Sequence, residues 1–310
     1  MRQSRPWAAV LAGGNGTRLQ SLTRSLAGDG RPKQFCRFFG GHTLLADTRA
    51  RISLNVEPDR TLYVVSRAHE PFYSSELADV DRWQLIEQPL NRGTTAAVAA
   101  ALFRLHAEPD EATIGFFPAD HYYRDAHVLQ ETVTRAYALA ALHPDRIVLI
   151  GAEASRAETE YGWIEPSPTI VHPRAGVPVH QVKGFWEKPS GQVAADLLTR
   201  RCLWNTLVVI GQLQAFKALL RATVPDVWDD FDARRPGGTL AEHQVALRDA
   251  YASIRPSDFS HEVLSTSPDR LLVVTLPEAG WTDLGQPHRV LDVLAERREV
   301  IGAGGLRLEA

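Results

Sequence analysis

Short apolar runs alternate with helix-length segments along the first half of the chain. The runs have the length and the apolar content of buried strands, and the longer segments between them have the apolar spacing of helices. Strands are predicted at 8–12, 61–65, 83–87, 114–117 and 147–150, and helices at 43–55, 69–78, 93–105 and 128–142. This alternation predicts an α/β fold with a Rossmann-like, doubly wound, mostly parallel sheet.

The pattern changes after residue 153, where proline and polar residues surround short apolar stretches. We expect this region to form mixed-sheet strands that extend over the same site as the loops of the first half. Strands are predicted at 161–165, 180–186, 203–210 and 271–276, and helices at 193–200, 212–222, 240–251 and 286–297. Sheets of this kind bind their ligands at the carboxyl ends of the strands, so the loops there are the candidate site.

Composition narrows the classes of function. The formal net charge of −3, from 34 basic and 37 acidic residues, argues against a nucleic acid or an anionic membrane surface as the main partner. No apolar run has the length of a membrane span. Cys36 and Cys202 are the two cysteines, which excludes a disulfide framework and a cysteine-based zinc site. We therefore expect a cytoplasmic protein, and the sequence leaves a homo-oligomer possible.

A glycine-rich turn follows the first predicted strand, in the segment Gly13-Gly14-Asn15-Gly16-Thr17-Arg18. Glycines let backbone N–H groups approach an anion, and Arg18 and Lys33 add two cations suited to phosphate. The P-loop pattern is excluded because Gly-Lys-Ser/Thr is missing, and a dinucleotide fingerprint is incomplete because Leu19 stands where a third glycine belongs. The turn is predicted to cradle a polyphosphate.

Two carboxylates follow predicted strands far apart in the chain. Asp120 lies in Phe-Phe-Pro-Ala-Asp-His, and Asp283 lies in Gly-Trp-Thr-Asp-Leu-Gly. Both could converge on a hard cation such as Mg²⁺, or each could simply cap a turn. Taken alone, each carboxylate is better interpreted as a turn residue. His121, next to Asp120, is expected to be structural.

Ala-Gly-Gly-Asn-Gly-Thr-Arg-Leu followed by Arg-Pro-Lys-Gln-Phe resembles the signature of the sugar nucleotidyltransferases, the nucleotide-sugar pyrophosphorylases. The Pro-Lys-Gln-Phe ending is most similar to the mannose-1-phosphate guanylyltransferase branch. The resemblance implies a nucleotide-diphospho-sugar transferase fold, with a catalytic domain at residues 1–298 and a tail at 299–310. It also implies transfer of GMP from GTP to mannose 1-phosphate with release of pyrophosphate.

The resemblance assigns a nucleotide site. Gln88 and the backbone near Gly93 would read the base, although this chain has Asn91-Arg92-Gly93-Thr94-Thr95 where the guanylyl branch usually has Arg-Asn-Thr-Ala-Pro. On the alternative interpretation, Asn91 and Thr94 cap the following helix. The implied nucleotide-binding residues are Ala12, Gly13, Gly14, Gly16, Thr17, Arg18, Lys33, Gln88, Gly93 and Thr94.

The resemblance also implies a sugar-phosphate site and a metal site. Segments similar to the family's Tyr-Gly-x-Ile, Phe-x-Glu-Lys-Pro and Trp-Asn-Ser/Thr-Gly occur in order, with Leu207 replacing the last glycine. The implied sugar-phosphate residues are Gly162, Glu187, Lys188 and Asn205; the implied Mg²⁺ ligands are Asp120 and Asp283; the implied catalytic residues are Arg18, Lys33, Asp120 and Lys188.

Two other functions stay open from the sequence. One is a thymidylyl- or uridylyltransferase acting on glucose 1-phosphate, which would keep the mechanism and change the substrates. The other is a non-catalytic, regulatory protein that binds nucleotide sugars, since a fold does not fix a function. The expected partners are a nucleoside triphosphate and a sugar 1-phosphate, with neither nucleic acid nor membrane.

Overall fold

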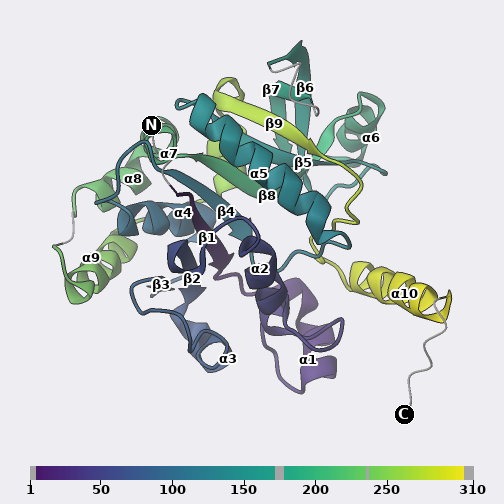
Figure 1. Ribbon diagram of the computed structural model, residues 1–310, viewed down its shortest axis with the longest axis horizontal. Helices are drawn as coiled ribbons and strands as arrows, with labels where there is room; N and C mark the ends of the chain where they lie inside the picture. The colour runs from purple at the N-terminus through teal and green to yellow at the C-terminus, as the bar shows by residue number, and fades with distance from the viewer. Residues whose placement is uncertain (1–4, 172–177, 235–236, 304–310) are drawn as a thin grey trace.

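The computed structural model describes residues 5–171, 178–234 and 237–303. Its strands form a single nine-stranded sheet in the order β3-β2-β1-β4-β8-β5-β9-β7-β6 (Figure 1). The strands are β1 (Trp7–Ala12), β2 (Thr61–Ser66), β3 (Leu85–Gln88), β4 (Thr113–Pro118), β5 (Ile147–Glu153), β6 (Gly162–Ile170), β7 (Val179–Glu187), β8 (Leu203–Gln212) and β9 (Leu271–Leu276).

The sheet is mixed, as predicted, and its parallel part is N-terminal. Strands β3, β2, β1 and β4 are parallel to one another, and β5 is parallel to β9. Strand β8 runs antiparallel to β4, β5 and β6, and β7 runs antiparallel to β6 and β9. The short connection between β6 and β7 explains part of this, because parallel neighbours need a crossover of a dozen or more residues. The prediction of a mostly parallel sheet therefore holds for β3, β2, β1 and β4 and is wrong for the rest of the described sheet, where most pairs are antiparallel.

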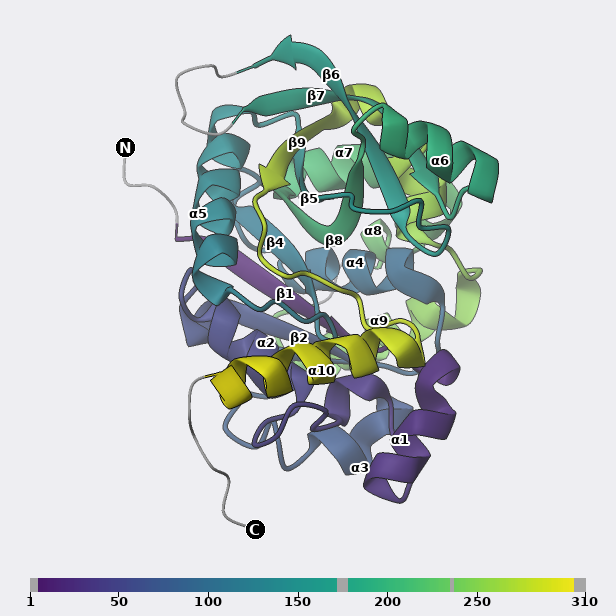
Figure 2. The same ribbon diagram turned by 90° about the vertical axis from the view of Figure 1, so that its right-hand side faces the viewer.

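Helices cover both faces of the sheet, as the doubly wound prediction requires (Figures 1 and 2). Side chains along β1 alternate between the two faces, and both faces are apolar. Ala9 packs in the core on the face covered by α4, α7, α8 and α9. Ala8 and Val10 pack in the core on the opposite face, covered by α2, α5 and α6. The helices are α1 (Gln20–Ala27), α2 (Leu44–Ile52), α3 (Glu70–Tyr73), α4 (Gly93–Arg104), α5 (Ala126–Leu142), α6 (Gly191–Thr199), α7 (Leu213–Thr223), α8 (Pro225–Asp232), α9 (Leu240–Ser253) and α10 (Pro287–Ala303).

Two helices and a π-helical turn were not predicted. Helix α1 is short and buries only Thr23, so it contributes little to the core. Helix α8 begins at Pro225 and buries Val227, Trp228 and Phe231, a pattern hidden in a stretch rich in aspartate and proline. The π-helical turn spans Phe259–Leu264.

The C-terminal helix extends further than predicted. Helix α10 continues to Ala303, beyond residue 299, where the tail was expected to begin, and residues 304–310 lie outside the described part of the chain. Its Val290 and Val293 form a small core with Leu19 and Cys36, which joins the chain's last helix to the glycine-loop region. Burial raises the pKa of the Cys36 thiol to about 11, in agreement with the expected buried, inert cysteine.

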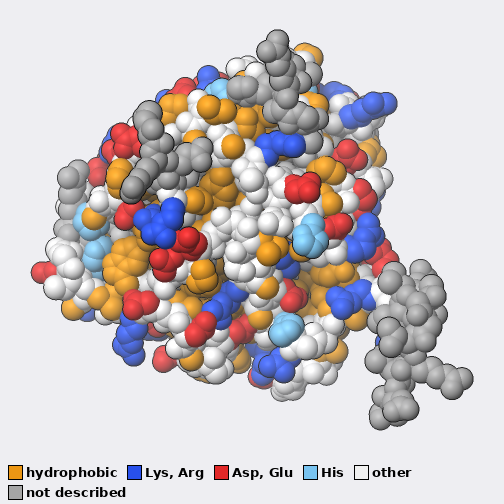
Figure 3. Space-filling model, viewed as in Figure 1, with side chains coloured by type: hydrophobic (Ala, Val, Ile, Leu, Met, Phe, Trp, Pro, Cys, Tyr) orange, Lys and Arg blue, Asp and Glu red, His pale blue; other side chains and the backbone are white. Residues whose placement is uncertain are grey.

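The surface agrees with the low net charge. On the face in Figure 3, acidic and basic side chains are interspersed, with hydrophobic atoms between them. Among the described residues, none of the helices combines the length and the apolar character that crossing a bilayer needs.

Candidate active site

The glycine turn after β1 is braced by the segment that carries Lys33. Gly16 has a φ of +59°, and a Cβ placed there would lie 3.1 Å from the Lys33 backbone nitrogen, so glycine is required. The buried Gln34 amide donates hydrogen bonds to the carbonyls of Ala12, at 2.9 Å, and Gly14, at 2.8 Å. Sequence reasoning assigned no role to Gln34, which here sets the shape of the turn.

Lys33 connects the two predicted metal ligands. Its Nζ lies 3.3 Å from Asp120 Oδ2 and donates a hydrogen bond to the backbone carbonyl of Asp283 at 2.5 Å. The Lys33 side chain is 11% exposed and that of Asp120 is 24% exposed, so this ion pair is screened less than a surface pair. Three residues that the sequence separates widely therefore lie in one place.

His121 is buried beside this cluster. Its Nδ1 accepts a hydrogen bond from the Trp281 indole N–H at 3.3 Å, which places the ring proton on Nε2, 3.8 Å from Asp120 Oδ1. Burial lowers the pKa of His121 to about 4, although Asp120 raises it in part. A neutral ring whose lone pair is already engaged is not available as a general base, which supports the expected structural role.

Asp283 is held as a carboxylate. Its Oδ1 accepts hydrogen bonds from the Gly285 backbone N–H at 2.7 Å and from Arg289 Nη1 at 2.5 Å. Burial would raise the pKa of the Asp283 carboxyl, but Lys33 and Arg289 outweigh burial and hold that pKa below its ordinary value. The Arg289 contact is unexpected, because nothing in the sequence distinguishes this arginine from other helical ones.

The chemistry of Asp120 and Asp283 fits Mg²⁺. The described residues contain no group of three or more His, Cys, Asp or Glu side chains placed to bind a metal. Mg²⁺ is commonly held by one or two carboxylates, with substrate phosphates and water completing its shell. Asp120 pairs with Lys33, and the same ammonium group binds the backbone carbonyl of Asp283, so two carboxylate residues lie beside one cation. They would supply the protein ligands, and the phosphates would come from the substrates.

The predicted base-reading residues form a second group. Gly13 packs so closely against Gln88 that a Cβ at Gly13 would lie 2.2 Å from Gln88 Nε2. Gln88 Oε1 accepts a hydrogen bond from the buried Tyr251 hydroxyl at 2.9 Å. Tyr251 lies on α9, far along the chain, and could not be assigned to this group from the sequence. The glycine turn and Gln88 therefore form one surface.

The start of α4 matches the capping interpretation of its sequence for Asn91 and not for Thr94. Gly93 has a φ of +83°, and a Cβ there would lie 2.2 Å from the Ser257 carbonyl oxygen, so no larger residue fits. Asn91 Oδ1 accepts from the Gly93 N–H at 3.1 Å, as a local cap. The Thr94 hydroxyl instead accepts from the Phe259 N–H at 2.9 Å and ties α4 to the π-helical turn.

The predicted sugar-phosphate residues also meet. A Cβ at Gly162 would lie 2.7 Å from Glu187 Oε2 and 3.2 Å from the Asn205 Cβ, so these three residues are in contact. Burial raises the pKa of the Glu187 carboxyl, against the lowering effect of Lys188, whose Nζ lies 3.5 Å away. Leu207 has a φ of +57°, so it adopts the left-handed conformation that glycine takes easily.

Arg18 stands apart from the other predicted catalytic residues. Its Nη1 pairs with Glu160 Oε2 at 2.7 Å, and both side chains are exposed. Thr17 beside it is exposed as well. The structure therefore brings Lys33, Asp120 and Asp283 together, while Arg18 is held by a carboxylate from the loop before β6.

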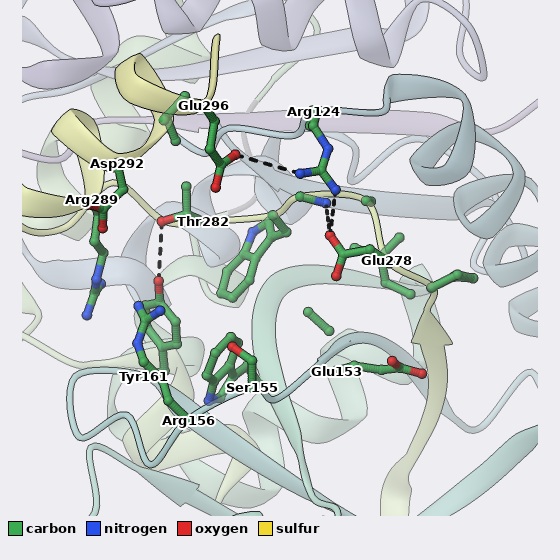
Figure 4. A pocket seen from close by; sticks show the side chains of 18 residues that line it. Arg124, Glu153, Ser155, Arg156, Tyr161, Glu278, Thr282, Arg289, Asp292 and Glu296 are labelled. Atoms are coloured by element: carbon green, nitrogen blue, oxygen red, sulfur yellow. Dashed lines mark hydrogen bonds and ion pairs between the residues drawn. The ribbon is translucent and has the colours of Figure 1, made fainter. Parts of the chain in front are cut away.

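A cavity of about 240 Å³ reaches Arg289, the arginine that binds Asp283 (Figure 4). Its lining includes Tyr161, Thr282 and Arg289, and the Tyr161 and Thr282 hydroxyls lie 3.4 Å apart. On the opposite wall Arg124 pairs with Glu278 at 2.9 Å. None of the predicted site residues lines this cavity, so it is separate from the catalytic cluster.

Comparison with known proteins supports a common ancestry along nearly the whole chain. The family described as nucleotidyl transferase matches residues 7–299. The chain is 30% identical to the alginate biosynthesis protein AlgA of Pseudomonas fluorescens, over 89% of this chain and 56% of that protein. It is 30% identical to a mannose-1-phosphate guanylyltransferase of Sinorhizobium fredii, over 89% and 52% respectively. The chain therefore spans about half the length of these curated relatives.

A solved structure agrees with the fold. The protein described as mannose-1-phosphate geranyltransferase from Thermus thermophilus superimposes with a TM-score of 0.77 at 29% identity, over 91% of this chain and 76% of that one. This likeness confirms a mixed α/β fold of the nucleotide-diphospho-sugar transferase type.

Proposed function

Since the chain belongs to the nucleotidyl transferase family, we propose that it transfers a nucleotidyl group from a nucleoside triphosphate to a sugar 1-phosphate and releases pyrophosphate. The family is the one that the sequence motifs predicted. The observation that carries the proposal is the convergence of Lys33, Asp120 and Asp283 beside the glycine turn. Cation, carboxylates and glycine backbone are the groups that a bound triphosphate and its metal would need.

The reaction is an in-line displacement at the α-phosphorus. An oxygen of the sugar phosphate forms a new P–O bond to that atom while the bond to the bridging oxygen breaks, and pyrophosphate leaves with the electron pair. No covalent intermediate with the protein is required, so catalysis is positioning and charge stabilisation. Lys33 and Arg18 would bind the triphosphate, and Lys188 would hold the attacking phosphate. Mg²⁺ held by Asp120 and Asp283 would supply charge neutralisation at the phosphates.

Arg18 must exchange partners in this scheme. In the structure its guanidinium is paired with Glu160 at the surface. An exposed pair of this kind contributes about 0–1 kcal/mol, so a triphosphate could displace Glu160 at little cost. This makes the position of Arg18 compatible with its proposed role.

We further propose GTP and mannose 1-phosphate as the substrates. Two observations support this choice: the Pro-Lys-Gln-Phe segment, and relatives that bear the name mannose-1-phosphate guanylyltransferase. The rival substrates are dTTP or UTP with glucose 1-phosphate. Gln88 can serve either set, because an amide carries both a donor and an acceptor.

The test is pyrophosphate release from four nucleoside triphosphates, each paired with mannose, glucose and N-acetylglucosamine 1-phosphates, with and without Mg²⁺. A strong, Mg²⁺-dependent signal with GTP and mannose 1-phosphate is the expected result. A signal with another pair would keep the reaction and change the specificity. Tight binding of a nucleotide sugar without any release of pyrophosphate would refute the enzyme and favour the regulatory protein.

A further inference from the structure

Arg289, in the first turn of α10, is a buried cation that the predicted site does not include. The residue is 3% exposed. Its Nη1 binds Asp283 Oδ1, and its Nη2 lies 2.8 Å from Glu158 Oε2. Its guanidinium carbon lies 4.3 Å from the centre of the Tyr161 ring, beside which it stands in Figure 4. A guanidinium fixed by two carboxylates and one aromatic face has a single orientation.

This contact distinguishes the two oxygens of Asp283. Oδ1 accepts hydrogen bonds from both Arg289 and the Gly285 N–H, so its lone pairs are engaged. Oδ2 accepts no hydrogen bond from the described residues. Asp283 therefore presents one oxygen for a further ligand, and Arg289 determines which one.

The same arginine links Asp283 to the loop before β6. Glu158, its second partner, accepts a hydrogen bond from the Glu160 N–H at 3.1 Å. Glu160 in turn pairs with Arg18, and the loop continues directly into the predicted sugar-binding Gly162. One buried guanidinium thus joins Asp283 to the loop whose Glu160 pairs with Arg18.

We propose that Arg289 is a positioning residue, which holds Asp283 Oδ1 so that Oδ2 is directed at the divalent cation. The proposal rests on the proposed function, since it assigns a metal to Asp283. The direction of the change in metal affinity distinguishes this role from a simple effect of charge. Through charge alone, removing a cation near a metal site makes the binding of a divalent ion tighter. If Arg289 orients the carboxylate, removing it makes that binding weaker, by about 10- to 100-fold as for other partners of metal ligands.

The experiment measures the dissociation constant for Mn²⁺ alone, by electron paramagnetic resonance of the free ion, on the full chain. Three variants are compared with the unmodified protein: Glu158→Gln, Glu158→Gln/Arg289→Met and Arg289→Lys. The double variant removes the positive charge of Arg289 together with the negative charge of Glu158. Removing Arg289 alone would leave two buried carboxylates, Glu158 and Asp283, without their cation. Arg298→Gln, an exposed arginine on the same helix, is the matched control.

We expect Arg298→Gln to bind Mn²⁺ as the unmodified protein does. The double variant should bind it at least about tenfold more weakly than Glu158→Gln, the single variant from which it differs only by the loss of Arg289. Arg289→Lys keeps the charge but loses the planar fork, so it too should bind more weakly. Unchanged or tighter binding in a folded double variant, or unchanged binding in Arg289→Lys, would overturn the proposal. So would absence of Mn²⁺ binding by the unmodified protein. Pyrophosphate release by the unmodified protein, measured separately, tests the proposed function independently.

Discussion

The contact between Gly13 and Gln88 makes a sharp prediction for Gly13→Ala. The new methyl group would lie 2.2 Å from Gln88 Nε2, and the next nearest atoms, Gln88 Cδ at 3.4 Å and Ser66 N at 3.8 Å, are at ordinary contact distances. Since carbon contacts are normally about 3.5–4.0 Å, the amide must move by more than about 1 Å. The Gly13 φ lies outside the left-handed region, so the backbone accepts alanine. The substitution acts through Gln88.

The size of the effect follows from what Gln88 touches. Moving the amide breaks its hydrogen bond from the Tyr251 hydroxyl, but that hydroxyl keeps the Ala96 carbonyl as an acceptor at 3.1 Å. The loss in unfolding free energy should therefore be only about 1 kcal/mol. If Gln88 reads the base, losing that contact costs about 1–3 kcal/mol of binding, which is roughly a 10- to 100-fold rise in KM for the nucleotide. Turnover at saturation should change little, because the proposed role of Gln88 is to bind the base and not the reacting phosphate.

The assay is steady-state pyrophosphate release, combined with urea unfolding of each variant. Gly14→Ala is the control for folding, since no atom lies within 4 Å of a Cβ there. In a Gln88→Ala background the added methyl group has nothing to displace, so Gly13→Ala should then raise KM no further. A Gly13→Ala protein with unchanged nucleotide KM, or one that loses turnover instead, would refute the reasoning.

Three further substitutions, at Asp120, Gly93 and His243, have defined expected outcomes. Asp120→Asn should lower kcat for pyrophosphate release by roughly a hundredfold or more while the protein stays folded, and near-full activity would remove Asp120 from the mechanism. Gly93→Ala should lower the unfolding free energy by more than about 1 kcal/mol in urea titration. Gly93 has a φ of +83°, and the new methyl group would lie 2.2 Å from the Ser257 carbonyl oxygen. Gly191→Ala, at an exposed position with no atom nearby, is the control and should not lower it. Burial lowers the pKa of His243 to about 4, whereas its pKa in the unfolded chain is about 6.5. Between pH 6.5 and pH 4 the unfolded state therefore binds more protons than the folded state. The free energy of unfolding should fall as the pH drops through this range. That loss should be about 2 kcal/mol by pH 5, and His243→Leu should show a correspondingly flatter dependence in urea unfolding at pH 7 and pH 5.

Local patterns determined much of this protein. The runs at 61–65, 114–117 and 271–276 are strands within one or two residues of their predicted bounds, because a buried strand is a short apolar segment whose signal lies entirely within itself. The glycine turn was equally readable, since its conformation at Gly16 needs glycine at that position. Helices whose apolar faces are narrow, such as α1, gave no such signal.

The tertiary structure decided which side chains meet. Lys33 and Asp283 are 250 positions apart, and they touch because the strand order brings the loops after β1, β4 and β9 to one end of the sheet. Tyr251 and Arg289 lie in no local motif, and Gln34 lies in Pro-Lys-Gln-Phe without a role that the motif reveals. Only their packing shows that these residues brace Gln88, Asp283 and the glycine turn, respectively. Periodicity is a property of neighbouring residues, whereas a site is made where distant segments are brought together. The sequence by itself therefore determined the elements and the chemical groups available, and the order and direction of the strands determined which of those groups share a site.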